Sequence, residues 1–160
     1  MTDDMTVRWM TPESAVADAP GLLALIQGLA EFEGWAEHVD ITEDEIIRRA
    51  RLPQPAFRAV LATDTHGTAV GMATVYDTVY THSLRPSLEL EMLFVAEPWR
   101  ARGVGRALIT QVIETGKRGG YDKMEWNVLK TNARAQAFYR QFGGDEQAEW
   151  QRWGLVFGSS

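Results

Sequence analysis

The sequence predicts a mixed α/β fold in which a mostly antiparallel central sheet is flanked by helices, in a single domain over residues 1–160. Apolar residues recur at helical spacing near the N-terminus and again after residue 103. The middle of the chain changes period and is rich in Val, Thr and Tyr, which favour strands. Strands and helices then alternate in the second half, as α/β proteins require.

Composition excludes several classes of protein. The chain has 160 residues and no cysteine, so disulfide scaffolds and thiolate metal sites are excluded. Its formal charge of −6 argues against a general nucleic-acid binder, because such binding depends on Lys and Arg. The acidic first residues and the absence of a long apolar run argue against a signal peptide and a membrane span. We therefore expect a soluble, cytoplasmic protein with neither nucleic-acid nor membrane partners.

The first third of the chain predicts one strand and two helices. Residues 7–10 resemble a short first strand. Apolar side chains at helical spacing predict a helix over residues 20–32. Thr42 directly precedes three acidic residues, a pattern typical of a helix N-cap, and Pro53 ends that second helix.

The middle of the chain predicts strands. Residues 57–62 and 69–80 flank the turn-forming residues 64–67, so they predict a hairpin. A third strand follows over residues 87–95.

The last third predicts alternating helices and strands. An apolar stripe predicts a helix over residues 103–118, and it is followed by a strand over 123–129. A second helix over 133–142 ends at a pair of glycines. Residues 153–157 predict a last strand.

Arginines and glycines gather where the strand 87–95 meets the following helix. A helix N-terminus presents unpaired N–H groups, glycine lets the backbone approach a pyrophosphate, and arginine adds charge-assisted contacts. The spacing alone is equally compatible with an anion site and with a simple tight turn. The residues concerned are Arg100, Arg102, Gly103, Gly105 and Arg106.

Two motifs carry a resemblance to a known family. Arg100-x-x-Gly103-x-Gly105, after the strand, resembles the acetyl-coenzyme A motif of the GNAT superfamily of N-acetyltransferases. Residues 132–143 resemble the superfamily's N-x-x-A-x-x-F-Y-x-x-F-G helix. The resemblance implies the GNAT acetyltransferase fold, with acetyl-CoA as co-substrate and no metal.

A narrower resemblance concerns the branch. Residues 25–33, together with Leu90-Glu91 before the strand 93–95, resemble the diamine and polyamine (spermidine/spermine) N-acetyltransferases. That branch implies transfer of an acetyl group to a primary amine of a small polycation by direct attack. It also implies a homodimer.

The resemblance assigns three groups of residues to acetyl-CoA. The backbone of the strand is expected to pair with pantetheine, the loop and helix start to hold the pyrophosphate, and the later helix to contact the pantetheine arm. The strand residues are Leu93, Phe94 and Val95. The pyrophosphate residues are Arg100, Ala101, Arg102, Gly103, Val104, Gly105 and Arg106. The residues that contact the pantetheine arm are Asn132, Arg134 and Ala135.

Two residues are expected to move protons. Tyr139 matches the general acid that protonates the departing thiolate, although a helix tyrosine can also serve only for packing. Glu91 matches a substrate-side glutamate and is the candidate base, acting through water. Strand alternation puts Glu89 and Glu91 on one face unless a bulge intervenes, and a solvated strand face is the simpler alternative.

The acceptor side is expected to be acidic and aromatic. The resemblance and the residue types select Phe32, Glu33, Trp35, Glu91 and Trp126 as substrate-binding residues. Carboxylates would steer a polycation, and tryptophans can contact an ammonium group. The simpler alternative is that most of the acidic residues in this region are solvated helix caps and most of the tryptophans are core or interface residues. The three histidines show no metal-binding spacing.

Other functions remain open at this point. The acceptor could be an aminoglycoside-type antibiotic or an amino-acid derivative, and a protein amine is a weaker alternative. A chain of this family could also be a non-catalytic acyl-CoA sensor. The presence of Tyr139 and Glu91 favours the enzyme.

Overall fold

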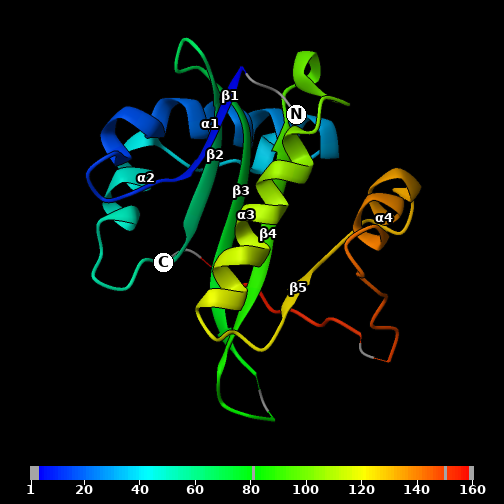
Figure 1. Ribbon diagram of the computed structural model, residues 1–160. Helices are drawn as coiled ribbons and strands as arrows, with labels where there is room; N and C mark the ends of the chain where they lie inside the picture. Colours follow the sequence, from blue (N-terminus) through cyan, green and yellow to red (C-terminus); the bar gives the residue numbers. More distant parts are fainter. Residues whose placement is uncertain (1–3, 81, 150, 159–160) are drawn as a thin grey trace. The chain divides into compact units, whose positions relative to one another are not determined.

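The computed structural model describes residues 4–80, 82–149 and 151–158. They form two compact units, Met1–Asn127 and Val128–Ser160, which are described separately. In the first unit a strand and two α-helices precede three consecutive strands, and a further α-helix and a last strand follow them (Figure 1). Their bounds are β1 Met5–Trp9, α1 Ala15–Glu33, η1 Ala36–His38, α2 Glu43–Ala50, β2 Arg58–Asp64, β3 Ala69–Val79, β4 Pro86–Val95, η2 Glu97–Trp99, α3 Val104–Arg118 and β5 Met124–Trp126. The second unit contains α4, Ala133–Arg140.

Within the described residues the strands form one sheet in the order β1-β2-β3-β4-β5. The first four strands pair antiparallel, whereas β5 pairs parallel to β4. The parallel pair needs a crossover connection, and α3 provides it. The predicted mixed, mostly antiparallel sheet is confirmed.

Helices cover both faces of the sheet. In Figure 1, α1 and α2 lie on one face and α3 crosses the other. Leu22 and Ile26 of α1 are buried against Leu61 and Met72 of the sheet. On the opposite face α3 buries Leu108 among other apolar residues. Each such side chain contributes about 1.5–3 kcal/mol to stability through the apolar area it removes from water.

Helix α1 also has the length and apolar composition of a membrane-spanning helix. Here its apolar side packs against the sheet, and its C-terminal turns carry Glu31 and Glu33 on the exposed side. Packing on the sheet accounts for its apolar composition.

Helix α1 begins at Ala15, earlier than the predicted start at residue 20. Asp18 lies on its buried side and accepts hydrogen bonds from both terminal nitrogens of Arg8, at 2.8 and 2.7 Å. Ser14 Oγ donates to the same carboxylate at 2.7 Å. The prediction was wrong because it counted apolar residues, and here an ion pair between a partly exposed arginine and a buried aspartate extends the packed face. Pro20 lies inside the helix.

Two predicted elements near the C-terminus are shorter in the structure than predicted. The strand predicted over residues 123–129 covers only Met124–Trp126, and the helix predicted to residue 142 ends at Arg140. Gly143, at φ +82°, and Gly144, whose N–H donates to the Tyr139 carbonyl, close that helix.

The last predicted strand was wrong. Residues 151–158 contain no strand, and within them the apolar side chains are 80–92% exposed. An apolar segment forms a strand only where a neighbouring strand pairs with its main-chain N–H and C=O groups, and the sequence does not reveal that neighbour.

Candidate active site

A β-bulge interrupts β4 at Glu91. Leu90 pairs with Val75 of β3 and Met92 pairs with the adjacent Thr74, so Glu91 is an extra residue between the two pairs. A bulge bends its strand and disturbs the alternation of side chains between faces.

The side-chain contacts on the two sides of the bulge show this change. Before it, Leu88 lies against α3, since its Cδ1 is 3.0 Å from where a Cβ on Gly116 would be. After it, Met92 and Phe94 pack on the α1 side of the sheet. The even-numbered residues therefore change faces across Glu91.

Glu91 itself is exposed, whereas Glu89 is half-buried. The bulge removes the regular alternation that predicted a common face for these two carboxylates. The expected role of Glu91 as a base is therefore supported by the resemblance and by the exposed position of Glu91 at the bulge, and not by strand alternation.

The edge of β4 beyond the bulge is open on the β5 side within the described residues. β5 pairs only with Leu88, Glu89 and Leu90. Ala96 N–H donates to β3 at the Val70 carbonyl. Since main-chain groups alternate between the two edges of a strand, Leu93 and Val95 direct theirs to the open edge. Phe94 directs its own to β3. The Val95 carbonyl already accepts from Arg100, so the groups left at this edge are the main-chain groups of Leu93 and the N–H of Val95.

The loop after β4 leads directly into the N-terminus of α3. Ala101 and Gly103 adopt left-handed conformations, at φ +59° and +84°. The first main-chain hydrogen bond of the helix runs from Ala107 N–H to the Gly103 carbonyl. The first turn, beginning at Val104, therefore presents main-chain N–H groups at the positive end of the helix dipole. The predicted strand–loop–helix arrangement is present and can hold an anion.

The two loop arginines lie differently. Arg102 is exposed, with its guanidinium carbon 4.1 Å from the centre of the Trp99 ring. Arg100 is turned back toward the sheet: its Nε donates to the Val95 carbonyl at 3.0 Å. Its guanidinium carbon also lies 5.4 Å from the ring centres of both Phe32 and Phe94. Arg100 therefore connects the loop to the end of β4 and to α1.

Three predicted substrate residues lie at or just beyond the C-terminal end of α1. Phe32 is 65% exposed and contacts Arg100. Glu33 accepts a hydrogen bond from Trp35 Nε1 at 3.2 Å, across the helix end at Gly34. A fourth, Trp126, lies at the end of β5 and pairs with Leu90, the residue before Glu91.

The second unit carries the predicted general acid. Asn132 caps α4, because its Oδ1 accepts from Ala135 N–H at 3.0 Å. Phe138 packs edge-to-face on Tyr139 and on Phe142, with ring centres 5.4 and 5.1 Å apart. Tyr139 is half-buried and Arg134 is exposed. The motif over residues 132–143, which predicted the pantetheine contacts, thus also contains the residue that caps α4.

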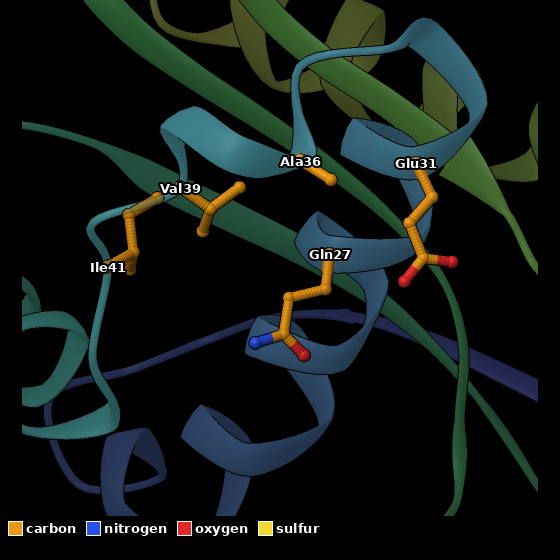
Figure 2. A pocket seen from close by; sticks show the side chains of 5 residues that line it. All are labelled: Gln27, Glu31, Ala36, Val39 and Ile41. Atoms are coloured by element: carbon orange, nitrogen blue, oxygen red, sulfur yellow. The ribbon is translucent and has the colours of Figure 1, made fainter.

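A groove beside α1 was not predicted from the sequence. Its volume is about 390 Å³, and Figure 2 shows Gln27 and Glu31 on neighbouring turns of α1, beside the segment that includes η1. Apolar residues complete the lining: Ala36, Val39 and Ile41. The signal available in the sequence was Gln27 and Glu31 one helical turn apart, outside the apolar stripe.

The described residues contain no group of His, Cys, Asp or Glu side chains arranged to hold a metal ion.

Comparison with known proteins gives one family and several relatives. A profile of the acetyltransferase (GNAT) family matches residues 23–144. Thialysine N-epsilon-acetyltransferase of Mus musculus is 24% identical over 147 residues, which are 88% of this chain and 86% of that protein. L-ornithine N5-acetyltransferase of Arabidopsis thaliana is 36% identical over 62 residues, 39% of this chain and 27% of that protein.

Solved structures share the fold. An aminoglycoside acetyltransferase from an uncultured soil metagenomic sample, in complex with sisomicin, has a TM-score of 0.78 and 18% sequence identity. The match covers 96% of this chain and 98% of that chain.

Proposed function

Since the chain belongs to the acetyltransferase (GNAT) family and is an acetyl-CoA-dependent N-acetyltransferase, we propose that its acceptor is a primary amine of a small polycation of the diamine or polyamine class. The acceptor side of the proposed site is the C-terminal end of α1, with Phe32, Glu33 and Trp35. Charge is the observation that carries the acceptor class: residues 31–40 contain four acidic residues and no Lys or Arg, whereas Glu45 further on is paired with Arg48 and Arg49. Such a segment attracts cations and repels anions.

The named relatives support an amine on a flexible aliphatic chain. Thialysine N-epsilon-acetyltransferase and L-ornithine N5-acetyltransferase are named for acceptors that carry a side-chain amine. Those acceptors are amino acids, so an amino acid with a terminal amine is the second candidate acceptor. A carboxylate on the acceptor would meet the acidic end of α1, which is why the polycation is preferred.

The residues of the first unit fit acetyl-CoA as co-substrate. The open edge of β4 offers the main-chain groups of Leu93 and the N–H of Val95 to an extended chain. The start of α3 offers N–H groups to a pyrophosphate, and Arg102 adds a positive charge at the exposed loop. Bound there, acetyl-CoA supplies an acetyl thioester.

The reaction moves protons off the amine and onto the thiolate. Glu91, through a water, accepts the proton that the ammonium form must lose. The neutral amine nitrogen then attacks the thioester carbonyl carbon, a C–N bond forms, and the C–S bond breaks with its electron pair on sulfur. The nitrogen, positively charged after the attack, releases its second proton to solvent. By the resemblance, Tyr139 donates a proton to the departing thiolate and regains one from solvent.

The association state and location are part of the same proposal. We propose a cytoplasmic homodimer, supported by the resemblance to the polyamine branch. Sedimentation equilibrium of the full chain measures the mass directly, and a monomer at micromolar concentration would contradict the dimer.

A panel of amines tests the acceptor. Free-thiol release from acetyl-CoA is measured for a monoamine, a diamine, spermidine, ornithine and an aminoglycoside, at low and high salt. The diamine and spermidine should give the highest kcat/KM, and salt should reduce their turnover more than that of the monoamine. A preference for ornithine would select the second candidate. Equal values across the series would remove the polycation proposal.

A further inference from the structure

We propose that Thr74, in the middle of β3, is a positioning residue that holds Glu91 in the bulge of β4 through a buried water molecule. The effect on the reaction rests on the proposed function, in which Glu91 is the base. The water site does not depend on that role and is tested without measuring activity.

The Thr74 hydroxyl is buried and has no partner within the protein. Thr74 is 2% exposed, and among the described residues its Oγ1 is the buried side-chain oxygen that makes no hydrogen bond. Asp18, also buried, accepts from Arg8. Ser87 Oγ, equally buried, donates to the Lys123 carbonyl at 3.3 Å. Buried polar groups in folded proteins are almost always bonded to protein or to ordered water, because an unpaired one is costly.

The even-numbered residues of β3 direct their main-chain groups toward β4. Tyr80 N–H donates to the Arg85 carbonyl at 2.9 Å, beyond one end of the strand pair. At the other end Ala96 N–H donates to the Val70 carbonyl, also at 2.9 Å. Since main-chain groups alternate between the two edges of a strand, Thr74, midway between these bonds, also faces β4.

Glu91 and Met92 both lie opposite Thr74. The residues of β4 that face β3 are odd-numbered on the Arg85 side of the bulge and even-numbered beyond it. The two patterns meet at Glu91 and Met92, which therefore both direct main-chain groups to the same point on β3. The extra residue of a bulge is left out of the regular ladder. Main-chain groups of Glu91 thus need a partner beside Thr74.

The Thr74 side chain lies on the α1 face of the sheet. Met72, two positions earlier on β3, and Ala59, which pairs with Thr74 from β2, both belong to the core that packs under α1. Met92, which pairs with Thr74 from β4, packs against the same core. Side chains two positions apart on a strand share a face. The hydroxyl is therefore surrounded by apolar residues, next to the bulge.

Together these groups can hold a water molecule. A buried water makes about three hydrogen bonds, and a hydroxyl can both donate and accept. Thr74 Oγ1 and the main-chain groups of Glu91 supply such partners in surroundings that are otherwise apolar. One water then satisfies the hydroxyl and the bulge at once. Because the Glu91 side chain is exposed, its position depends on this main chain.

Urea denaturation distinguishes a bonded hydroxyl from an unpaired one by the sign of the effect. If Thr74 Oγ1 holds the water, Thr74→Val removes its hydrogen bonds and should lower the urea midpoint. If the hydroxyl is unpaired, the same change removes a buried polar group from an apolar interior and should raise the midpoint, which would overturn the proposal. Thr78→Val calibrates the fall, because Thr78 Oγ1 donates directly to the Ser87 carbonyl at 3.4 Å.

A crystal structure of the full chain tests the water directly. We expect an ordered water within hydrogen-bond distance of Thr74 Oγ1 and of a main-chain nitrogen or oxygen of Glu91. The Thr74→Val structure should lack it. A Thr74 hydroxyl with no such water in the unaltered chain would overturn the proposal, whatever the enzyme acetylates.

Kinetics test the positioning role, with the best acceptor of the amine panel. Thr74→Val should lower kcat about tenfold, while the acetyl-CoA KM stays within about twofold. Thr74→Ser loses a methyl group but keeps the hydroxyl, so it should cost stability and yet keep kcat within about twofold. Thr78→Val should leave kcat unchanged. An unchanged kcat in Thr74→Val would make Thr74 a purely structural residue and overturn the positioning role.

A double variant shows whether Thr74 acts through Glu91. In the Glu91→Gln background, Thr74→Val should lower kcat no further, because both changes remove the same effect. Losses that multiply would overturn the connection between the two residues. If Glu91→Gln alone leaves kcat unchanged, the proposed base fails, and the urea midpoint and the crystal structure still decide whether Thr74 holds a water at the bulge.

Discussion

Arg100 donates from Nε to the carbonyl oxygen of Val95 at 3.0 Å, although its position in the motif suggests a side chain directed at a phosphate. Phe32 and Phe94 lie at equal distance from its guanidinium group. The close approach of α1 to β4 at this point requires Gly28, because a Cβ there would lie 2.8 Å from the Phe94 ring. Arg100 thus joins the loop to both elements that border it.

Arg100→Lys should therefore destabilise the fold. Lysine keeps the positive charge but lacks the planar guanidinium group, which donates to the Val95 carbonyl and lies near the rings of Phe32 and Phe94. We expect the free energy of unfolding to fall by about 1–2 kcal/mol, measured by urea denaturation. The control change Arg118→Lys, at an exposed side chain in the last turn of α3, should cost less than about 0.5 kcal/mol. Unchanged stability with weaker acetyl-CoA binding would instead make Arg100 a direct ligand.

Gly103→Ala should weaken acetyl-CoA binding. A Cβ at Gly103 meets no atom within 4 Å, so any cost comes from its φ of +84° and from the ligand. Gly120 is the control, since it has φ +73° and equally open space near the other end of α3. Both variants should lose similar stability, about 1 kcal/mol. Only Gly103→Ala should reduce acetyl-CoA affinity, by about tenfold in calorimetry. Equal affinities would refute the pyrophosphate site.

Tyr139→Phe should reduce kcat and spare binding. The change removes only the hydroxyl group and keeps the ring contact with Phe138. A positioned general acid contributes roughly 10²–10⁴-fold to the rate. Tyr121→Phe is the control, because the Tyr121 hydroxyl donates to Asp77 at 2.8 Å and has no proposed part in the reaction. If single-turnover rates of the Tyr139 variant stay within about twofold, Tyr139 is a packing residue.

Glu91→Gln should lower kcat without changing the acetyl-CoA KM. The amide cannot accept the proton that the ammonium form loses, so the loss should be largest at neutral pH and smaller at high pH. Glu114→Gln removes the same charge from an exposed position on α3 and should leave kcat unchanged. A pH–rate profile of the two variants provides the measurement. Parallel profiles would remove Glu91 from the reaction.

The buried Asp18 should make stability depend on pH. Hydrogen bonds from Arg8 lower the pKa of Asp18 below its ordinary value of 3.8. The carboxylate therefore contributes stability that is present above that ordinary value and is lost as the pH falls through the folded-state pKa. Asp18→Asn should cost about 1–3 kcal/mol at pH 7 and less at pH 3, by urea denaturation. Exposed Glu13→Gln should show no such dependence. An equal cost at both pH values would contradict the assignment.

Local pattern predicted much of the first unit. Apolar spacing located the core of α1, Thr42 located the start of α2, and the glycines located the loop before α3. These features arise from residues close together in the chain, so a short window of sequence contains them.

The errors concern relations between distant residues. The start of α1 depends on Arg8, ten positions before Asp18. A strand over residues 153–157 would need a neighbour that no local pattern identifies. The bulge at Glu91 depends on how β4 registers against β3. The groove beside α1 requires the η1 segment to return across the helix, which the spacing of Gln27 and Glu31 does not indicate.

Glu91, the extra residue in β4, determines which face of the sheet the later side chains of the strand occupy. Because of this residue, Leu88 and Phe94, which are six positions apart, pack against different helices. The even-numbered side chains of β4 therefore pack on the α3 side of the sheet before Glu91 and on the α1 side after it. Deleting Glu91 would restore simple alternation and exchange the faces of every residue from Met92 to Val95. The Phe94 ring would then lose its contacts with both Gly28 and Arg100. Loss of one residue here should therefore be far more damaging than most point substitutions at the same position, and β4 should tolerate changes in length at its hairpin end instead.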